Sequence, residues 1–254
     1  MIKVIVNGAA GKMGSETVRA VSKEKDMKLV GACDTKNVGA DAGGVKISKD
    51  LQALIKAEKP DVVVDFTHPN VAMENAKAIL EAKVNAVIGT TGLSEADLKE
   101  IKALCSKNGV NCIVAPNFAV GAVLMMTFAK TAAKYMPNVE IIETHHDKKA
   151  DAPSGTAIKT AELILEGSSI EKNKISEKET VIGARGGNMK NIHIHSVRLP
   201  GFVAHQEVIF GGLGQSLRIK HDTISRESFM PGVIMSIRKV KGAKGLVYGL
   251  ENLL

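Results

Sequence analysis

Aromatic side chains are scarce in this chain of 254 residues: they make up 3% of it, and tryptophan is absent. Stacking on the bases of single-stranded nucleic acid is therefore not expected. A core with few aromatic rings has to be built from aliphatic side chains, which is typical of helices layered on aliphatic strands. Hydrophobic residues make up 44% of the chain, a content that predicts a folded globular protein rather than a disordered one.

Cysteine is also rare, with three residues and no pair separated by only two positions. An odd number without such a pair argues against a disulfide framework and against a thiolate zinc site. The first residues form a strand-like segment with no charged-then-apolar leader. We therefore expect a cytoplasmic protein.

No uninterrupted apolar run suggests a membrane span. The longest uncharged stretch, residues 108–129, contains Pro116 and Gly121 and therefore predicts a strand, a loop and a helix. The formal net charge is +7, but most basic residues alternate with acids, as on solvated helix faces. We expect no membrane and no nucleic acid as partners, and a bias toward small anionic ligands.

The first half of the chain alternates short aliphatic strands with helical stretches. Such alternation predicts a doubly wound, Rossmann-type parallel sheet that helices cover on both faces. The expected strands are 2–6, 28–32, 62–65, 86–89 and 111–114, and helices are expected to begin near Lys12, Asp50, Asn70 and Ser94.

The pattern changes after residue 117. Helices are expected over 120–135 and from Ser154, and strands over 139–145, 193–199, 204–210 and 216–221. Closely spaced strands with glycine-containing turns predict an α+β substrate and oligomerisation domain with a mostly antiparallel sheet. Glycine-rich residues 183–189 are expected to form a mobile loop. The last segment, from Arg226, is helical in pattern and is expected to return to the first domain. The predicted domains are thus 1–117 with 226–254, and 118–225.

Three glycines, Gly8, Gly11 and Gly14, follow the first strand directly, and Asp34 ends the second strand. The glycines allow a pyrophosphate to approach the start of a helix, and an acid at this distance accepts hydrogen bonds from a ribose. The alternative is a tight turn without a ligand. Strand, helix and acid in the expected order favour a dinucleotide site.

The type of dinucleotide depends on charge near the ribose. Asp34 repels a 2′-phosphate, while Lys36, Lys12 and His68 can offset that repulsion. We therefore predict use of both NADH and NADPH. The loops 89–91 and 115–118 follow two further parallel strands and are expected to line the nicotinamide half of the cleft.

Residues 143–156 concentrate proton donors, a positive charge and a helix start. His145 and His146 end a strand, Lys149 follows, and Gly155 and Thr156 open a helix whose first N–H groups attract an anion. Singly, a serine or threonine here is usually a cap and a strand-end histidine a surface residue. Capping and packing do not require the whole combination, which predicts an active site for an anionic substrate.

Together, the segments 8–14, 64–67, 89–91, 115–118 and 143–156 resemble the dihydrodipicolinate reductase family. The resemblance continues through 196–198, Gly201, His205, Arg226 and 229–232 and thus covers the whole chain. It implies NAD(P)H-dependent reduction of 4-hydroxy-tetrahydrodipicolinate (dihydrodipicolinate) to tetrahydrodipicolinate, in the diaminopimelate route to lysine. It also implies a small dicarboxylate substrate and a cytoplasmic homotetramer.

The resemblance assigns roles to individual residues. It makes His145 a proton donor and acceptor, Lys149 a proton donor, and His146, Gly155 and Thr156 binders of the substrate. The cofactor residues that it implies are Gly8, Ala9, Ala10, Gly11, Lys12, Met13, Asp34, Gly89, Thr90, Thr91, Ala115, Pro116, Asn117 and Phe118. The chain departs from the family at Thr35 and His68, where some members carry arginines that meet a 2′-phosphate.

Three other interpretations stay open at this point. One is another small NAD(P)-dependent dehydrogenase, of the aspartate or homoserine type, and a second is a regulator that senses a dinucleotide. A metal enzyme is the third, since His193 and His195 would share one strand face. Adjacent His145 and His146 point to opposite faces of a strand and cannot easily share an ion, so no metal is expected.

Overall fold

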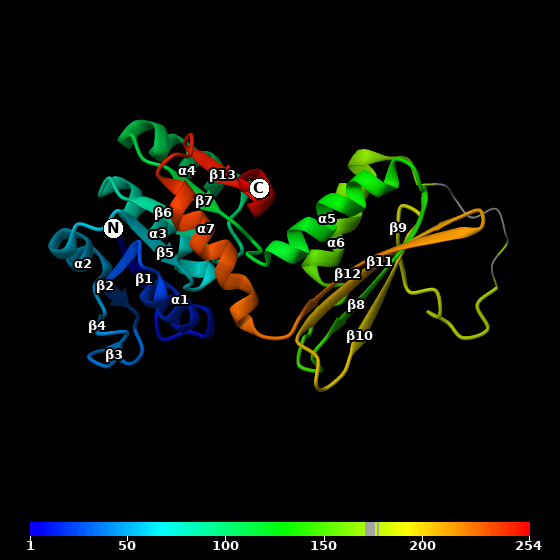
Figure 1. The fold of residues 1–254 in the computed structure, drawn as a ribbon, viewed down its shortest axis with the longest axis horizontal. Helices are drawn as coiled ribbons and strands as arrows, with labels where there is room; N and C mark the ends of the chain where they lie inside the picture. Colours follow the sequence, from blue (N-terminus) through cyan, green and yellow to red (C-terminus); the bar gives the residue numbers. More distant parts are fainter. Residues whose placement is uncertain (171–175, 177) are drawn as a thin grey trace. The chain divides into compact units, whose positions relative to one another are not determined.

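The computed structural model describes residues 1–170, 176 and 178–254. The chain forms two compact units, residues 1–120 with 226–254 and residues 121–225 (Figure 1). Residues 118–120, which we expected in the second domain, group with the first. The reason is Phe118, which is buried and meets the ring of Phe66 edge-on, with 5.7 Å between the ring centroids.

The sheet of the first unit has the strand order β13-β7-β6-β5-β1-β2-β4-β3. Neighbouring strands are parallel except for the hairpin of β3 and β4. The strands are β1 Ile2–Asn7, β2 Met27–Cys33, β3 Asp41–Ala42, β4 Val45–Ser48, β5 Val62–Asp65, β6 Asn85–Ile88, β7 Cys112–Val114 and β13 Leu246–Tyr248. The central strands β5, β6 and β7 are buried along nearly their whole length, as expected of a sheet covered on both faces.

Helices cover this sheet on both faces. They are α1 Lys12–Lys23, α2 Leu51–Glu58, α3 Pro69–Glu81, α4 Glu95–Asn108 and α7 Met230–Val240, with short 3-10 helices η1 Arg226–Phe229 and η2 Leu250–Leu253. Side-chain caps explain why two of them begin where the sequence predicted: Asp50 accepts from the Ala53 amide, and Ser94 forms a capping box with Asp97. The predicted Rossmann-type fold is confirmed, and the helix after Arg226 packs against α1 and β6.

Three short strands of this unit were missed. β3 and β4 form a hairpin whose turn, Gly43 and Gly44, adopts left-handed backbone with φ +66° and +89°. Such paired glycines are a hairpin signal in the sequence. β13 adds three residues to the edge beside β7, a long-range pairing that its own sequence does not reveal.

The second unit places its sheet in the order β12-β11-β8-β10-β9. The strands are β8 Asn138–His145, β9 Gly187–Met189, β10 Ile192–Arg198, β11 Ala204–Gly212 and β12 Gln215–Thr223, and the helices are α5 Val120–Ala133 and α6 Gly155–Gly167. All pairs are antiparallel except β8 with β10. The predicted mostly antiparallel sheet is confirmed.

One feature of this unit was not predicted, its strand order, and one expectation, the mobile loop at 183–189, was wrong in part. β10 and β11 follow each other along the chain but do not pair, because β8 lies between them. β8 is central because its alternate residues Val139, Ile141 and Glu143 are all buried. Part of the expected mobile loop is the strand β9, whose residues Gly187–Met189 pair with β10.

The two faces of the second sheet differ. α5 and α6 lie together on one face (Figure 1), where Gln206 of β11 donates a 2.7 Å hydrogen bond to the Thr160 hydroxyl of α6. On the opposite face, Ile142 and Ile209 are half-buried. Within the described residues, no helix is both long and apolar enough to span a bilayer.

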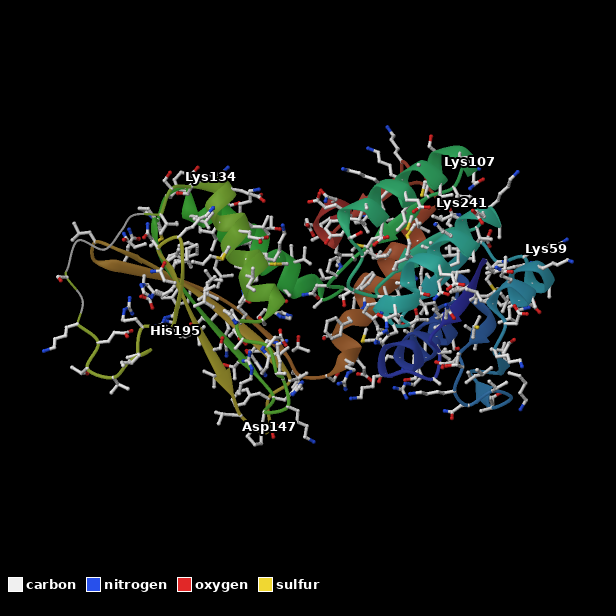
Figure 2. The ribbon with its side chains drawn as sticks, turned by 180° about the vertical axis from the view of Figure 1, so that it is seen from behind. Lys59, Lys107, Lys134, Asp147, His195 and Lys241 are labelled. Atoms are coloured by element: carbon white, nitrogen blue, oxygen red, sulfur yellow. The ribbon has the colours of Figure 1, made fainter. Side chains whose placement is uncertain are left out.

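Exposed lysine side chains of the first unit lie on separate elements. Lys59, Lys107 and Lys241 are exposed and follow α2, lie in α4 and follow α7, respectively (Figure 2).

Candidate active site

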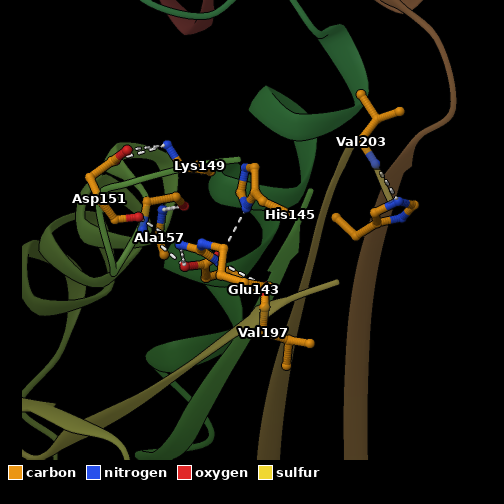
Figure 3. Close-up of polar contacts among 10 residues, drawn as sticks. Glu143, His145, Lys149, Asp151, Ala157, Val197 and Val203 are labelled. Atoms are coloured by element: carbon orange, nitrogen blue, oxygen red, sulfur yellow. Dashed lines mark hydrogen bonds and ion pairs between the residues drawn. The ribbon is translucent and has the colours of Figure 1, made fainter. Parts of the chain in front are cut away.

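A buried carboxylate, that of Glu143, organises the polar residues at the end of β8 (Figure 3). Its side chain is fully buried, and Oε2 lies 2.5 Å from Nδ1 of His145. Oε1 accepts a 3.1 Å hydrogen bond from the backbone N–H of Ser154. One carboxylate therefore contacts both the predicted catalytic histidine and the residue that caps α6.

Arg198, at the end of β10, forms a bidentate pair with the same carboxylate through both terminal nitrogens of its guanidinium. Nη1 donates to Oε2 at 2.9 Å and Nη2 donates to Oε1 at 2.7 Å. Nη2 also donates to the backbone carbonyl of Asp151 at 2.7 Å. Arg198 thus ties Glu143 to the loop 146–153, which carries Lys149.

These contacts shift two pKa values. Burial acts to raise the pKa of Glu143, but hydrogen bonds from Arg198 and His145 outweigh it and lower the pKa. Burial also lowers the pKa of His145, against the opposing effect of Glu143. The free protein therefore favours an ionised Glu143 beside a neutral His145.

The neutral imidazole has a defined arrangement of its proton. Since Glu143 is an acceptor, the ring carries its hydrogen on Nδ1 and leaves Nε2 with a lone pair. Protonation then places a second N–H on Nε2, away from the carboxylate. His145 can therefore take up a proton and release it at Nε2.

Lys149 lies on the loop after β8 and turns its ammonium toward Asp151 (Figure 3). Nζ is 2.8 Å from each carboxylate oxygen of Asp151. The backbone N–H of Lys149 donates to the carbonyl of His146 at 3.2 Å, which closes a turn between the two predicted site residues. Asp151 is more than half exposed, so another anion can replace it as the partner of Lys149.

The start of α6 has the properties of an anion site. Ser154 caps the helix by accepting a 3.2 Å hydrogen bond from the Ala157 amide. Within the described residues, no partner is found for the N–H groups of Gly155 and Thr156. A Cβ added at Gly155 would meet no atom within 4 Å. Free donors beside open space suit a carboxylate.

The histidines of the metal hypothesis are engaged in other contacts. His195 Nε2 lies 2.8 Å from Glu140, and His193 Nδ1 lies 2.7 Å from the carbonyl oxygen of Arg185. Over the ranges that the structure describes, no three histidine, cysteine or acidic side chains gather in a way that would hold a metal ion.

In the first unit, the glycine-rich turn is so tightly packed against the protein backbone that two of its positions admit only glycine. Gly8 has φ +81°, and a Cβ there would come 2.4 Å from the Phe66 carbonyl oxygen. A Cβ at Gly14 would lie 2.0 Å from the Gly8 oxygen. Gly11 precedes α1 and offers no side chain to cap it. Over the described part of the chain, no partner is found for the N–H groups of Lys12 and Met13, and free N–H groups at a helix start suit a pyrophosphate.

Asp34 stands directly beside this turn. Its two carboxylate oxygens accept 2.9 Å hydrogen bonds from the backbone N–H groups of Ala10 and Lys36. The remaining lone pairs can receive the hydroxyls of a ribose. His68 has a different use, because its Nδ1 accepts from the Asn70 amide and caps α3.

The two expected nicotinamide loops follow β6 and β7, which are neighbours in the sheet. Gly89 has to be glycine, since a Cβ would lie 2.0 Å from the Phe66 ring. The Ala115 amide donates to the Ile88 carbonyl at 3.0 Å, which holds the two loop origins together. Thr91 and Pro116 are exposed at this edge, and Asn117 accepts from the Ala119 amide at 2.8 Å.

Sequence reasoning missed a second buried carboxylate, that of Asp65, at the end of β5. Its oxygens accept hydrogen bonds from Asn7, Thr67, Asn75 and Thr90 at 2.7 to 3.1 Å. The network joins the ends of β1, β5 and β6, where ligands bind in such sheets. Its only sequence signal was an acid at the end of an otherwise aliphatic strand.

Glu143 and Arg198 were also missed as site residues. The signal for Glu143 was its position, because it continues the buried alternation of Val139 and Ile141. A charged residue on the core-facing side of a strand needs a partner. Its partner, Arg198, lies 55 residues further along the chain, so no local pattern could identify it.

Two features define the class of protein. The first unit is a Rossmann unit whose first helix begins with free N–H groups, and the second unit holds an imidazole and an ammonium beside a helix start suited to an anion. The chain is an NAD(P)-dependent oxidoreductase. Family models narrow the class: residues 2–118 match the N-terminal part and residues 121–254 the C-terminal part of dihydrodipicolinate reductase. The chain belongs to the dihydrodipicolinate reductase family.

Individual relatives agree with this membership. A 4-hydroxy-tetrahydrodipicolinate reductase of Desulfitobacterium hafniense is 52% identical, over 100% of this chain and 98% of the relative. One of Moorella thermoacetica is 51% identical, with the same coverage. A solved structure, dipicolinate-bound dihydrodipicolinate reductase from Paenisporosarcina sp. TG-14, is 48% identical over the whole of both chains, with a TM-score of 0.93.

Proposed function

We propose that this chain catalyses the NAD(P)H-dependent reduction of 4-hydroxy-tetrahydrodipicolinate (dihydrodipicolinate) to tetrahydrodipicolinate, the step in the diaminopimelate route to lysine that its relatives are named for. The proposal depends on one observation: the Glu143–His145 contact lies beside Lys149 and the start of α6, where no partner is found among the described residues for two backbone N–H groups. This arrangement supplies a proton and binds two negative groups, as a cyclic dicarboxylate requires.

The substrate carboxylates have separate partners in this proposal. The N–H groups of Gly155 and Thr156 bind one carboxylate at the start of α6. Lys149 leaves Asp151 and pairs with the other, and His146, half-buried beside the turn, contacts the substrate. The dipicolinate in the related solved structure is a ligand of the same dicarboxylate class.

Proton delivery falls to His145 and Lys149. The substrate loses its 4-hydroxyl group as water to give the conjugated ring of dihydrodipicolinate, and the reduced cofactor, when bound, would supply the hydride that adds to this ring. Negative charge then builds on the ring, and a nearby protonated group has to quench it. The bound dianion favours the charged form of His145 and so opposes the effect of burial on its pKa. His145 releases the proton from Nε2, while Lys149 stabilises the charge and acts as a further donor.

The cofactor is either NADH or NADPH in this proposal. Asp34 receives the ribose hydroxyls of NADH, and Lys36 and Lys12 offset its repulsion of the NADPH phosphate. The residues that bind it are those of the turn at 8–13, Asp34 and the loops 89–91 and 115–118. Dual use predicts that kcat/KM for the two cofactors differs by less than about a thousandfold, roughly 4 kcal/mol.

The assembly is a cytoplasmic homotetramer in this proposal. Ile142, Val197 and Ile209 support it, since they are half-buried on the sheet face opposite α5 and α6 and offer apolar surface to another copy. Sedimentation equilibrium should then give a mass of four chains. A monomer at micromolar concentration would contradict the assembly without touching the proposed reaction.

The reaction is tested by a coupled assay. The product of the preceding aldol condensation is generated in situ, and NADH oxidation is followed by absorbance. We expect oxidation only when the condensing enzyme is active. Oxidation with aspartate or homoserine-type substrates instead would favour the rival dehydrogenase, and NADH binding without oxidation would favour a sensing protein.

A further inference from the structure

We propose that Glu143 and Arg198 are positioning residues of this reaction: Glu143 fixes the orientation and tautomer of His145, and Arg198 holds the Lys149 loop against the same carboxylate. The inference rests on the proposed function and adds two residues to its machinery. Neither residue touches the substrate in it. Both act through side chains that do.

The first step concerns the imidazole ring. A 2.5 Å contact between Nδ1 and Oε2 of Glu143 admits one neutral tautomer, with the hydrogen between these two atoms. The ring cannot turn over without losing this contact, so Nε2 stays on the opposite side. A base held by a carboxylate in this way is the arrangement that orients histidine in catalytic triads.

The second step concerns the carboxylate itself. Four hydrogen bonds fix it: two from Arg198, one from His145 and one from the Ser154 amide. The Ser154 amide directly precedes Gly155, the first residue of the proposed carboxylate site. Glu143 therefore sets the distance between the proton-transfer atom and the start of α6.

The third step concerns the loop. Arg198 Nη2 bonds both Glu143 Oε1 and the carbonyl of Asp151 at 2.7 Å. Asp151 in turn pairs with Lys149. The guanidinium fork therefore joins the histidine side of the site to the lysine side, which a single ammonium cannot do with the same geometry.

Stability alone gives a weaker reason for this buried ion pair. Removing two charges from water costs several kcal/mol per ion, and apolar residues of similar volume often replace such pairs without loss. The Glu143 side chain has no exposed surface, and that of Arg198 is 19% exposed. The desolvation cost of the Glu143–Arg198 pair has an explanation if the pair holds reacting groups in place.

The same strand provides a matched control. Glu140 of β8 also contacts an arginine and a histidine, Arg185 at 2.6 Å and His195 at 2.8 Å. Glu140 lies three positions before Glu143 and therefore on the opposite face of the sheet. Its replacement removes a carboxylate from a similar cluster that lies away from α6.

The experiment compares Glu143→Gln, Arg198→Met, Arg198→Lys and Glu140→Gln in the coupled assay. We expect Glu143→Gln and Arg198→Met to lower kcat by at least about tenfold, the scale of lost outer-shell support. The dissociation constant of NADH, from its own fluorescence, should stay within about twofold, since the cofactor turn lies in the other unit. Arg198→Lys should recover part of the kcat lost in Arg198→Met.

The pH profile separates positioning from general damage. Glu143 raises the pKa of His145, whereas Lys149 and Arg198 lower it, so Glu143→Gln should move the histidine limb of kcat/KM to lower pH. Wild-type kcat with an unmoved limb in Glu143→Gln would overturn the proposal. An equal loss in Glu140→Gln, in a variant whose sedimentation mass matches that of the wild type, would do the same. If Glu143→Gln does not fold, the two Arg198 variants decide, and equal kcat in both counts against positioning.

Failure of the underlying function looks different. In that case the wild-type protein itself does not oxidise NADH with the condensation product. An active wild type with unaffected variants contradicts only the roles of Glu143 and Arg198.

Discussion

The Thr90 hydroxyl donates a 2.7 Å hydrogen bond to the buried carboxylate of Asp65. This bond ties a loop that we propose for the cofactor to the end of β5. Asn7 and Asn75 donate to the same carboxylate from β1 and α3. The loop at 89–91 is thus held by side chains from elements that are far apart in sequence, and its geometry depends on an anion that the cofactor need not touch.

Thr90→Val removes this donor with little change in volume. An unmade hydrogen bond at a buried group costs about 1–3 kcal/mol, so the free energy of unfolding should fall by an amount in that range. The NADH dissociation constant should rise by about tenfold as the loop loosens, or about 1.4 kcal/mol. Urea unfolding and NADH fluorescence titration measure the two effects.

Thr127→Val is the control for this prediction. The Thr127 hydroxyl donates to the Val123 carbonyl within α5, in the second unit. Its loss should leave NADH affinity unchanged. Equal NADH affinity in Thr90→Val and wild type would show that the loop does not depend on Asp65.

Gly8→Ala tests the glycine-rich turn. The position has φ +81°, and the new Cβ would lie 2.4 Å from the Phe66 carbonyl oxygen. Left-handed backbone costs an alanine about 1–2 kcal/mol, and overpacking adds about 1–3 kcal/mol. We expect a total destabilisation of about 2–5 kcal/mol and loss of NADH binding.

The matched variant is Gly109→Ala, which ends α4. Gly109 has φ +67° but no atom within 4 Å of an added Cβ, so only the backbone cost of about 1–2 kcal/mol applies. Thermal or urea unfolding of both variants isolates the clash. Equal destabilisation in Gly8→Ala and Gly109→Ala would mean that the backbone at Phe66 moves away and relieves the clash.

His145→Gln and Lys149→Ala test the proton donors. Each should lower kcat by at least about a hundredfold, the usual scale for general acid–base groups, with NADH affinity unchanged. Lys148→Ala removes a neighbouring exposed lysine and should keep wild-type kcat. Turnover close to wild type in both site variants would refute the assignment.

Acid should destabilise the protein through two half-buried histidines, His145 and His221. Burial lowers the pKa of His145 and of His221 in the folded state. Below the ordinary histidine pKa, the unfolded chain then binds more protons than the folded one, so stability falls as pH falls toward the folded pKa values. Above the ordinary pKa, these two histidines contribute no slope.

Urea unfolding between pH of about 7.5 and 5.5 measures this slope. His221→Gln should make it shallower, since one of the two groups is gone. The lowered pKa of Glu143 acts in the same direction at more acidic pH, because its stabilisation is lost as the carboxylate becomes protonated. A free energy of unfolding that rises on acidification would contradict the direction of both histidine shifts.

The sequence revealed local features far better than long-range ones. The starts of α2 and α4 were predictable because Asp50 and Ser94 cap their own helices within three residues. Glu143 and Arg198 were not, because their contact spans 55 residues and depends on parallel pairing of β8 with β10. The strand order of the second sheet depends on which strand lies between two others. The alternation of buried and exposed residues within a single strand does not reveal its neighbours.

We predict that cofactor choice depends on two residues close in sequence, Asp34 and Lys36. The backbone N–H of Lys36 donates a 2.9 Å hydrogen bond to Asp34, so Lys36 follows closely on the carboxylate that would meet the ribose. Lys36→Ala should lower kcat/KM for NADPH by about tenfold, the effect of losing about 1.4 kcal/mol of charge pairing, and leave NADH nearly unchanged. Asp34→Asn should shift the preference toward NADPH, since it removes the charge that repels a 2′-phosphate and an acceptor for the NADH ribose.

Steady-state kinetics with both cofactors distinguishes these effects from a general loss of binding, and Lys46→Ala, which removes another exposed lysine, is the control. If Lys36→Ala weakens both cofactors equally, the side chain supports the loop rather than the phosphate, and the compensation of Asp34 has to come from Lys12.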